Sequence, residues 1–358
     1  MQGETEQVVD GDNNLQSKKK TEKIRKSKSL IWIILLIIVV AGGTYYLFLG
    51  QDKTTIISEE PNSTTEDAES VSISVDEEWV VAPDILKQNQ TSTDTHKLAD
   101  GTYRMYQMMP GGIYYADSSD CITFGQAVET GVREEAGKMI SNPAVLQISE
   151  KNWIMIYEMA PMRKAGQQGN VPPSATTQRN LYLATSTDGK AFVKAGIAID
   201  SSKQDNFFAS VPDLVKTPDG KVRMYYVSGG NATGSAISVD NGQTWVREDG
   251  YRLANAVVDA DVTWETAKNG TQTSWVMYYS VLDPARNGIY KAISTDGLKW
   301  ENETKLFASS AGGAIVDPDV VQISPTNYVM FFGQSSMGGS TGGEQINLYR
   351  AELNKSIF

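Results

Sequence analysis

"VPDLVKTPDGKVRMYYVSGGNATGSAISVDNGQTW" (residues 211–245) contains three strand-like runs in order, followed by a polar turn that ends in tryptophan. The runs are short and rich in Val, Ile, Tyr and Met, which is typical of β-strands. The first two runs are joined by Thr-Pro-Asp-Gly, a sequence with strong turn-forming chemistry. This stretch therefore predicts a meander of antiparallel strands.

The same order of runs occurs five times between residues 76 and 358. Methionine lies in the middle of the second run each time, at Met105, Met155, Met224, Met277 and Met330. The runs before them are "APDILK" (82–87), "NPAVLQ" (142–147), "VPDLVK" (211–216), "DADVTW" (259–264) and "DPDVVQ" (317–322). One such sheet cannot bury both its faces, but five sheets can pack face to face around an axis. We therefore predict an all-β, five-bladed β-propeller; one long or two tandem β-sandwiches would not repeat this order five times.

The last unit ends at "INLYRAEL" (346–353) without a polar turn. Its outermost strand is expected to come from the N-terminal side, from "VSISV" (71–75) or "EEWVV" (77–81). This strand would close the ring as a clasp.

The polar turn "SVDNGQTW" (238–245) has three relatives. They are "STDGKAF" (186–192), "STDGLKW" (294–300) and, more loosely, "SSDCITF" (118–124). Asp and Ser side chains accept hydrogen bonds from nearby backbone N–H groups, and glycine permits a positive φ. We therefore predict structural roles for the aspartates of these Asp turns, Asp188, Asp240 and Asp296. Cys121 stands at the glycine position of the fourth copy.

The N-terminal part has a different composition. "LIWIILLIIVVAGGTYYLFLG" (30–50) has no charged residue and is long enough to cross a bilayer as a helix. Lysine and arginine cluster before it, so residues 1–29 are expected in the cytoplasm and the propeller outside. Residues 51–75, rich in Ser, Thr and Glu, are expected to form a flexible stalk. A cleaved signal peptide ending at "VVA" (39–41) is the alternative.

Composition excludes several classes of function. The formal net charge is −11 although the first 50 residues are basic, so the acidic body disfavours nucleic-acid binding. The single cysteine, Cys121, and the single histidine, His96, exclude an intrachain disulfide and Cys/His zinc sites. His96 lies in a polar, loop-like stretch, which argues against a Ser-His-Asp triad. No ligand motif for a metal is present, and no cofactor is expected. Carboxylates must therefore carry any catalysis.

The best candidates lie on the first strand of each unit, which we expect to line the central channel. An acid follows the proline position in four of the five units, at Asp84, Asp213, Asp261 and Asp319. Asp259 and Asp317 stand two residues before the last two, on the same face of a strand. Such a ring of carboxylates suits glycoside hydrolysis, where one acid is kept protonated while another stays ionised. Alternatively, these repeated aspartates cap the strands and bond to the backbone of the next blade.

A few residues break the repeat. Glu158 follows the second methionine strand, Arg104 and Arg223 precede the methionine in units one and three, and Trp264 extends the inner strand of unit four. Aromatic side chains near an acidic pocket favour sugar rings. Each of these residues also has an ordinary explanation as a surface or inter-blade residue.

The unit pattern resembles the five-bladed propeller glycosidases of the arabinanase, invertase and levansucrase type. The phrases "VPDLVKTPDGKVRMYY" (211–226) and "AISTDGLKW" (292–300) are similar to their strand–turn–strand and Asp-Gly segments. The polar turn also resembles the Asp-box of sialidases, a likeness limited to these turns. The resemblance implies a catalytic Asp in the first blade, an Asp that tunes pKa in the second and a Glu acid in the third.

The sequence departs from that pattern. Asn142-Pro143 stands where the family often has Asp-Pro, and Ser210-Val211-Pro212 stands where it often has Glu-x-Pro. We therefore expect Asp84, Asp213 and Glu158 as catalytic residues, and Asp261, Asp319, Arg104, Arg223 and Trp264 as substrate-binding residues.

Two functions remain open. A membrane-anchored glycoside hydrolase-like protein acting on glycans predicts carboxylates separated by about 5–9.5 Å. A non-catalytic propeller that binds glycans or proteins predicts acids that are scattered or fully hydrogen-bonded.

Overall fold

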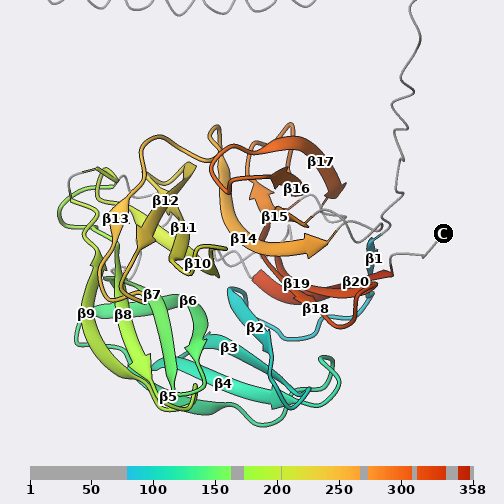
Figure 1. Cartoon of the computed structure of the whole chain (residues 1–358), viewed down its shortest axis with the longest axis horizontal. Helices are drawn as coiled ribbons and strands as arrows, with labels where there is room; N and C mark the ends of the chain where they lie inside the picture. The colour runs from blue at the N-terminus through green and yellow to red at the C-terminus, as the bar shows by residue number, and fades with distance from the viewer. Residues whose placement is uncertain are drawn as a thin grey trace, which may run out of the picture. The chain divides into compact units, whose positions relative to one another are not determined.

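The computed structural model describes residues 79–162, 173–202, 204–266, 273–308, 313–335 and 346–354. These residues form five four-stranded antiparallel sheets arranged around a central axis, as Figure 1 shows. The prediction of a five-bladed β-propeller is therefore confirmed.

The strands of each blade follow one another from the innermost to the outermost position, and only β1 is out of chain order. Blade 1 contains β2 (Thr93–Lys97), β3 (Tyr103–Met109), β4 (Gly112–Ser118) and β5 (Val128–Arg133). Blade 2 contains β6 (Lys138–Ser149), β7 (Asn152–Pro161), β8 (Asn180–Ser186) and β9 (Val193–Ile199). Blade 3 contains β10 (Ala209–Lys216), β11 (Val222–Ser228), β12 (Ala232–Ser238) and β13 (Val246–Arg247). Blade 4 contains β14 (Val257–Thr266), β15 (Thr273–Val281), β16 (Gly288–Ser294) and β17 (Glu301–Phe307). Blade 5 contains β18 (Ile315–Gln322), β19 (Asn327–Ser335), β20 (Ile346–Asn354) and β1 (Trp79–Val81).

The five methionines lie in the packed interior of their blades. Each is fully buried. Each also stands opposite an alanine on the third strand, as in the pair Met224↔Ala236. The small alanine leaves room for the long, adaptable methionine between neighbouring sheets. The repeat that predicted the fold is thus a repeat of core packing.

The clasp is formed by the second of the two expected segments. β1 pairs antiparallel with β20, with Trp79 opposite Leu353 and Val81 opposite Ala351. The Trp79 ring is buried and meets the Tyr278 ring edge-on at 6.0 Å. The N-terminal strand therefore completes the last blade and closes the ring.

The segment after the clasp corrects one prediction. Residues 82–87 do not form the innermost strand of blade 1; they continue along β20, where Ala82 N donates to Arg350 O at 2.8 Å. Leu86 N likewise donates to Leu348 O at 2.8 Å. β2 takes the innermost place instead. Asp84 is consequently exposed at the rim of blade 5.

The local role predicted for the Asp turns is confirmed. Asp188 Oδ1 accepts from the backbone N–H groups of Lys190 and Ala191 at 2.8 and 2.9 Å. Hydrogen bonds from Thr244 lower the pKa of Asp240 to about 2. Cys121 has a φ of 59°, close to the 67° of Gly189 at the same place in the next turn. These carboxylates are used within their own turns.

The predicted anchor (30–50) and stalk (51–75) lie outside the described residues. Within the described part of the chain, no helix has the length and apolar character needed to cross a bilayer.

Candidate active site in the central channel

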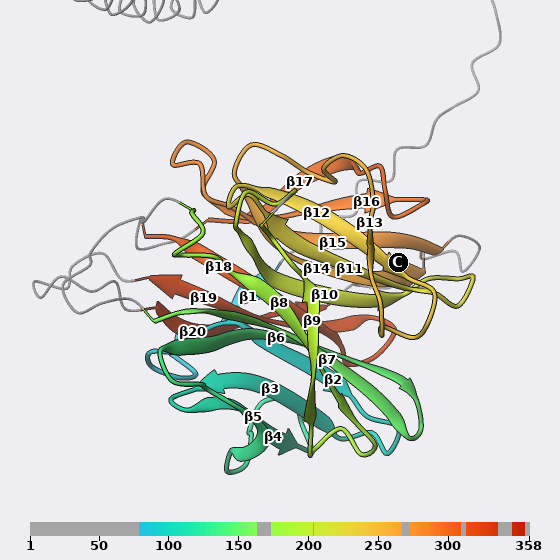
Figure 2. The same ribbon diagram turned by 90° about the vertical axis from the view of Figure 1, so that its left-hand side faces the viewer.

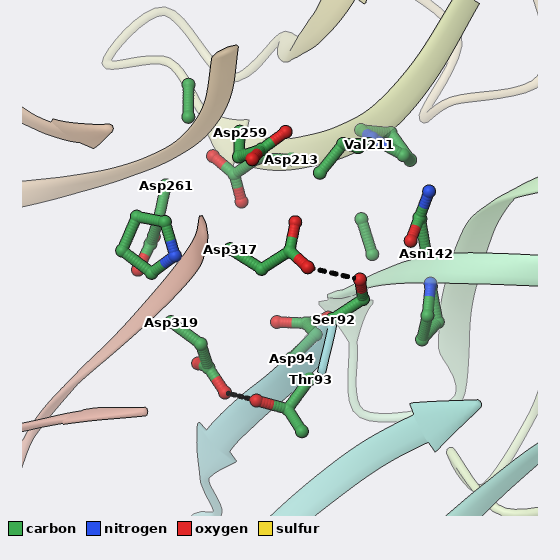
Figure 3. A pocket seen from close by; sticks show the side chains of 15 residues that line it. Ser92, Thr93, Asp94, Asn142, Val211, Asp213, Asp259, Asp261, Asp317 and Asp319 are labelled. Carbon is green, nitrogen blue, oxygen red and sulfur yellow. Dashed lines mark hydrogen bonds between the residues drawn. The ribbon is translucent and has the colours of Figure 1, made fainter. Parts of the chain in front are cut away.

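The innermost strands surround a channel that holds a pocket of about 40 Å³. Every blade contributes one run of three residues, which we call a channel triplet. The triplets are Ser92–Asp94, Asn142–Ala144, Val211–Asp213, Asp259–Asp261 and Asp317–Asp319. Figure 3 shows their side chains around the pocket. Five triplets at one level give the channel a ring of chemically different positions.

The first residue of every triplet adopts a left-handed backbone conformation. The φ angles are 54° for Ser92, 51° for Asn142, 42° for Val211, 54° for Asp259 and 53° for Asp317. In blades 2 to 5 the pairing register shifts at this point, which marks a β-bulge. A bulge re-aims side chains, so the simple two-residue alternation that we expected does not hold at these positions.

The third residues connect the blades, and we call the four acids among them the inter-blade aspartates. Asp213 Oδ2 accepts from Val262 N at 2.9 Å, and Asp319 Oδ1 accepts from Thr95 N at 3.0 Å. Asp94 and Asp261 accept the corresponding N–H groups of Val145 and Val320. Each acid thus bonds to the next blade. Asp213, Asp261 and Asp319 therefore bond to the backbone of the next blade, which was the alternative role for the repeated aspartates.

Blade 2 has Ala144 at this position and makes its link to blade 3 through Glu158. Glu158 is fully buried on β7 and accepts from the hydroxyl of Ser210 on β10. It also accepts from Asn142 Nδ2 and from Arg179 Nη1, each at 2.7 Å. With both oxygens engaged, Glu158 acts as an inter-blade connector; the structure gives it no free position facing the pocket.

Burial of several acids in one channel raises their pKa values. Burial, together with the charge of Asp94, raises the pKa of Asp213 to about 7 and that of Asp319 to about 6. Burial and the charges of Asp213 and Asp319 also raise the pKa of Asp261. These shifts follow because the ionised form loses hydration and meets like charges.

His96 lies on β2 and therefore not in a loop, which corrects the sequence expectation. Its Nε2 lies 3.0 Å from a carboxylate oxygen of Asp94. Burial lowers the pKa of His96, but the charges of Asp94, Asp319 and Asp213 outweigh it, and the net pKa is raised.

Asp259 and Asp317 are the only acids among the first residues of the triplets, and they come from neighbouring blades. Asp317 Oδ2 accepts from Thr91 Oγ1 at 2.6 Å and from Ser92 Oγ at 2.7 Å, the latter drawn in Figure 3. Burial raises the pKa of both acids, and the charge of Asp317 raises the pKa of Asp259 further, to well above its usual value. The two acids therefore favour one shared proton.

The remaining predicted substrate residues lie between blades and do not line the pocket. Arg104 is buried, and besides its pair with Asp117 in the same blade its Nη1 donates to Gly189 O of blade 2 at 3.3 Å. Arg223 Nη1 likewise donates to Asp296 O of blade 4 at 3.0 Å. Trp264 Nε1 donates to Lys216 O of blade 3 at 3.2 Å. The ordinary inter-blade explanation describes all three.

Sequence reasoning overlooked Asp94 and undervalued Asp259 and Asp317. One signal could have found Asp94: it precedes Met105 by the same number of residues as Asp213 precedes Met224 and Asp319 precedes Met330. Asp84 does not share that spacing.

No protein-family model matches the sequence, and no curated protein matches it. Solved structures do. An α-L-arabinofuranosidase from Lactobacillus brevis has a TM-score of 0.56 at 12% identity, over 76% of this chain and 92% of that chain. Zg3597, a family 117 glycoside hydrolase from Zobellia galactanivorans, has a TM-score of 0.54 at 12% identity, over 79% and 92%. A thermostable family-43 glycoside hydrolase has a TM-score of 0.54 at 12% identity, over 77% and 97%. At such identities the likeness establishes the fold, a propeller that glycoside hydrolases also have.

Proposed function

We propose that this chain is a glycoside hydrolase-like enzyme that acts on glycans at the channel pocket, with Asp259 and Asp317 as its reacting acids. The observation that carries the proposal is their pairing: two carboxyl groups from equivalent positions of neighbouring blades line one pocket, and burial raises the pKa of both. Hydrolysis of a glycosidic bond needs such a pair. The shared fold with glycoside hydrolases supports the same reading.

The environment divides the roles. Asp317 receives two hydroxyl hydrogen bonds, which stabilise its ionised form, whereas burial and the charge of Asp317 raise the pKa of Asp259 and favour its protonated form. Asp259 would donate its proton to the leaving-group oxygen, and Asp317 would accept a proton from water or attack the sugar carbon.

The size of the pocket limits where a sugar can lie. A volume of about 40 Å³ holds a water molecule but not a sugar ring. The sugar would therefore lie across the rim, with the reacting water below it.

The test is a turnover screen of the full-length chain against aryl glycosides and arabino- and xylo-oligosaccharides. We expect Asp259→Asn and Asp317→Asn each to lower kcat by about 100-fold or more. Asp84→Asn, an exposed acid outside the pocket, is the matched control and should leave turnover unchanged. Turnover that survives both channel substitutions would remove Asp259 and Asp317 from the mechanism.

A specific observation favours a second candidate, a non-catalytic propeller that binds glycans or proteins. The inter-blade aspartates and Glu158 are engaged by neighbouring blades, and the first triplet residues of blades 1 to 3 carry no acid. Binding of oligosaccharides without any turnover would favour this function.

We also propose that residues 30–50 anchor the protein in a membrane, with the propeller on the extracytoplasmic side. The uncharged run and the basic residues before it support this arrangement. Protease treatment of intact cells should digest the propeller and spare the N-terminal tail, and recovery of a chain that begins after residue 41 would instead indicate a cleaved signal peptide.

A further inference from the structure

Blade 3 lacks a tyrosine that the other four blades have. On the third strand, two residues before the alanine that faces the methionine, stand Tyr114, Tyr182, Tyr290 and Tyr349, and blade 3 has Gly234. In blades 2, 4 and 5 this tyrosine stacks on an aromatic ring of the second strand, with ring centroids 5.9 Å apart each time.

The backbone does not require glycine at this position. Gly234 is not among the residues with positive φ. A Cβ atom built on it would lie 3.3 Å from Ser228 Cβ, a tight contact, and 3.6 Å from the ring of Tyr226, the partner that the missing tyrosine would cover. Because Gly234 has no side chain where the other blades have a tyrosine ring, space opens on the outer half of the blade.

A polar ion pair fills the inner part of that space. Asp205 is almost fully buried, and its Oδ2 lies 2.6 Å from Arg247 Nη2. Its Oδ1 accepts from Tyr226 at 2.9 Å and from Ser228 at 2.7 Å. Arg247 Nε also donates to Asp205 Oδ2, at 2.9 Å. The remaining space is a pocket of about 480 Å³, in the range of small-molecule sites.

The outermost strand of blade 3 leaves one wall of this pocket open. β13 has 2 residues, whereas β9 and β17 have 7 each. The chain then turns back across the blade, where Thr233 N donates to Leu253 O at 2.8 Å. This return path places Tyr251, 55% exposed, beside the pocket. Figure 2 shows the blade from the side, with β12 and β13 at its outer part. An exposed aromatic ring above a polar floor is thus a feature of blade 3.

The charges indicate a neutral ligand. Arg247 neutralises Asp205, and Arg223 neutralises the half-buried Glu248 of the lining at 2.9 Å. Sugar hydroxyls both donate to carboxylates and accept from guanidinium N–H groups, and the C–H face of a sugar packs on tyrosine. We infer that this blade 3 pocket binds a neutral sugar unit of a glycan, at a site separate from the channel.

The experiment measures binding by calorimetry to the full-length chain, with xylohexaose and arabinohexaose as neutral probes and trigalacturonate as an anionic one. We expect a neutral probe to bind, and Tyr251→Ala to weaken it by about tenfold. Gly234→Tyr, which refills the pocket, should remove the binding signal that Tyr251→Ala weakens, while any binding at the channel persists. Tyr114→Ala, the equivalent tyrosine of blade 1, is the matched control and should change nothing.

Two of the variants named above separate this site from the proposed catalytic function. Asp317→Asn should abolish turnover and leave neutral-probe binding intact, whereas Tyr251→Ala should leave turnover of small aryl glycosides intact. The inference is overturned if no neutral probe binds, if only trigalacturonate binds, if Tyr251→Ala binds as well as the unaltered chain, or if Asp317→Asn alone removes binding.

Discussion

At the scale of single residues, a departure from the repeat can replace an inter-blade contact in one blade and leave a strained backbone in another. Glu158 breaks the repeat, which made it a catalytic candidate, but it replaces the connection that Ala144 cannot make. Val211 is the opposite case: a β-branched residue held at a φ of 42°, a conformation that such residues rarely adopt. Both residues show that departure from a repeat has to be interpreted with its contacts.

Removal of either partner of the Glu158–Arg179 pair should lower the unfolding free energy, but the two variants should lose different amounts. Arg179 is 25% exposed and Glu158 is fully buried, so a lone Arg179 can reach water and a lone Glu158 cannot. We expect Arg179→Met to cost about 3 kcal/mol of unfolding free energy or more, and Glu158→Gln about 1–2 kcal/mol. Urea unfolding of both variants measures the two losses of unfolding free energy, and a larger loss for Glu158→Gln would contradict the prediction.

Relief of the strain at Val211 should stabilise the protein. Asn tolerates the left-handed conformation, and blade 2 has Asn142 at the equivalent place. We expect Val211→Asn to raise the unfolding free energy by about 1 kcal/mol. Val215→Asn, at a buried site in the regular part of β10, is the control and should lower it.

At the scale of elements, the innermost strands of neighbouring blades place several aspartates close together in the channel. The folded-state pKa values of Asp213 and Asp319, about 7 and about 6, lie above the usual value of 3.8. Folding therefore favours their protonated forms. Their contribution to stability is full below pH 3.8 and is lost as the pH rises through 6 to 7.

The stability of the propeller should consequently fall between about pH 4 and pH 7. The raised pKa of His96 acts in the same direction, because its protonated form is favoured by folding and is lost as the pH rises. Thermal unfolding in a series of buffers measures the effect, and a flatter profile is expected for Asp213→Asn. A melting temperature that rises from pH 4 to pH 7 would contradict the assignment of raised pKa values.

The clasp is the second feature at this scale. Trp79 is buried and Val80 is 62% exposed on the same short strand. We expect Trp79→Ala to cost about 3–5 kcal/mol, and Val80→Ala to change little. Deletion of residues 71–81 should remove most of the stability; an unchanged melting temperature after that deletion would show that the ring closes without β1.

At the scale of the whole molecule, the sequence predicted the architecture well because the repeated methionine strands and Asp turns are local signals. It placed the innermost strand of blade 1 wrongly because β2, "TDTHK" (93–97), is polar: Thr93 and Thr95 bond to Asp319 in the channel. The site itself was less predictable. Bulges shift the pairing register between Val258 and Asp261 and between Val316 and Asp319, so both acids of each pair line the pocket, and strand periodicity carries no such information.

The order in which the ring is completed has a consequence for synthesis. Among the described strands, β1 is made first and its partner β20 last, since Trp79 pairs with Leu353. During translation β1 must stay unpaired until nearly the whole chain has emerged, and contacts so distant in sequence slow folding. A chain truncated by even one strand at its C-terminus would therefore leave β1 without its partner, so the cell could distinguish unfinished propellers from finished ones by that exposed strand.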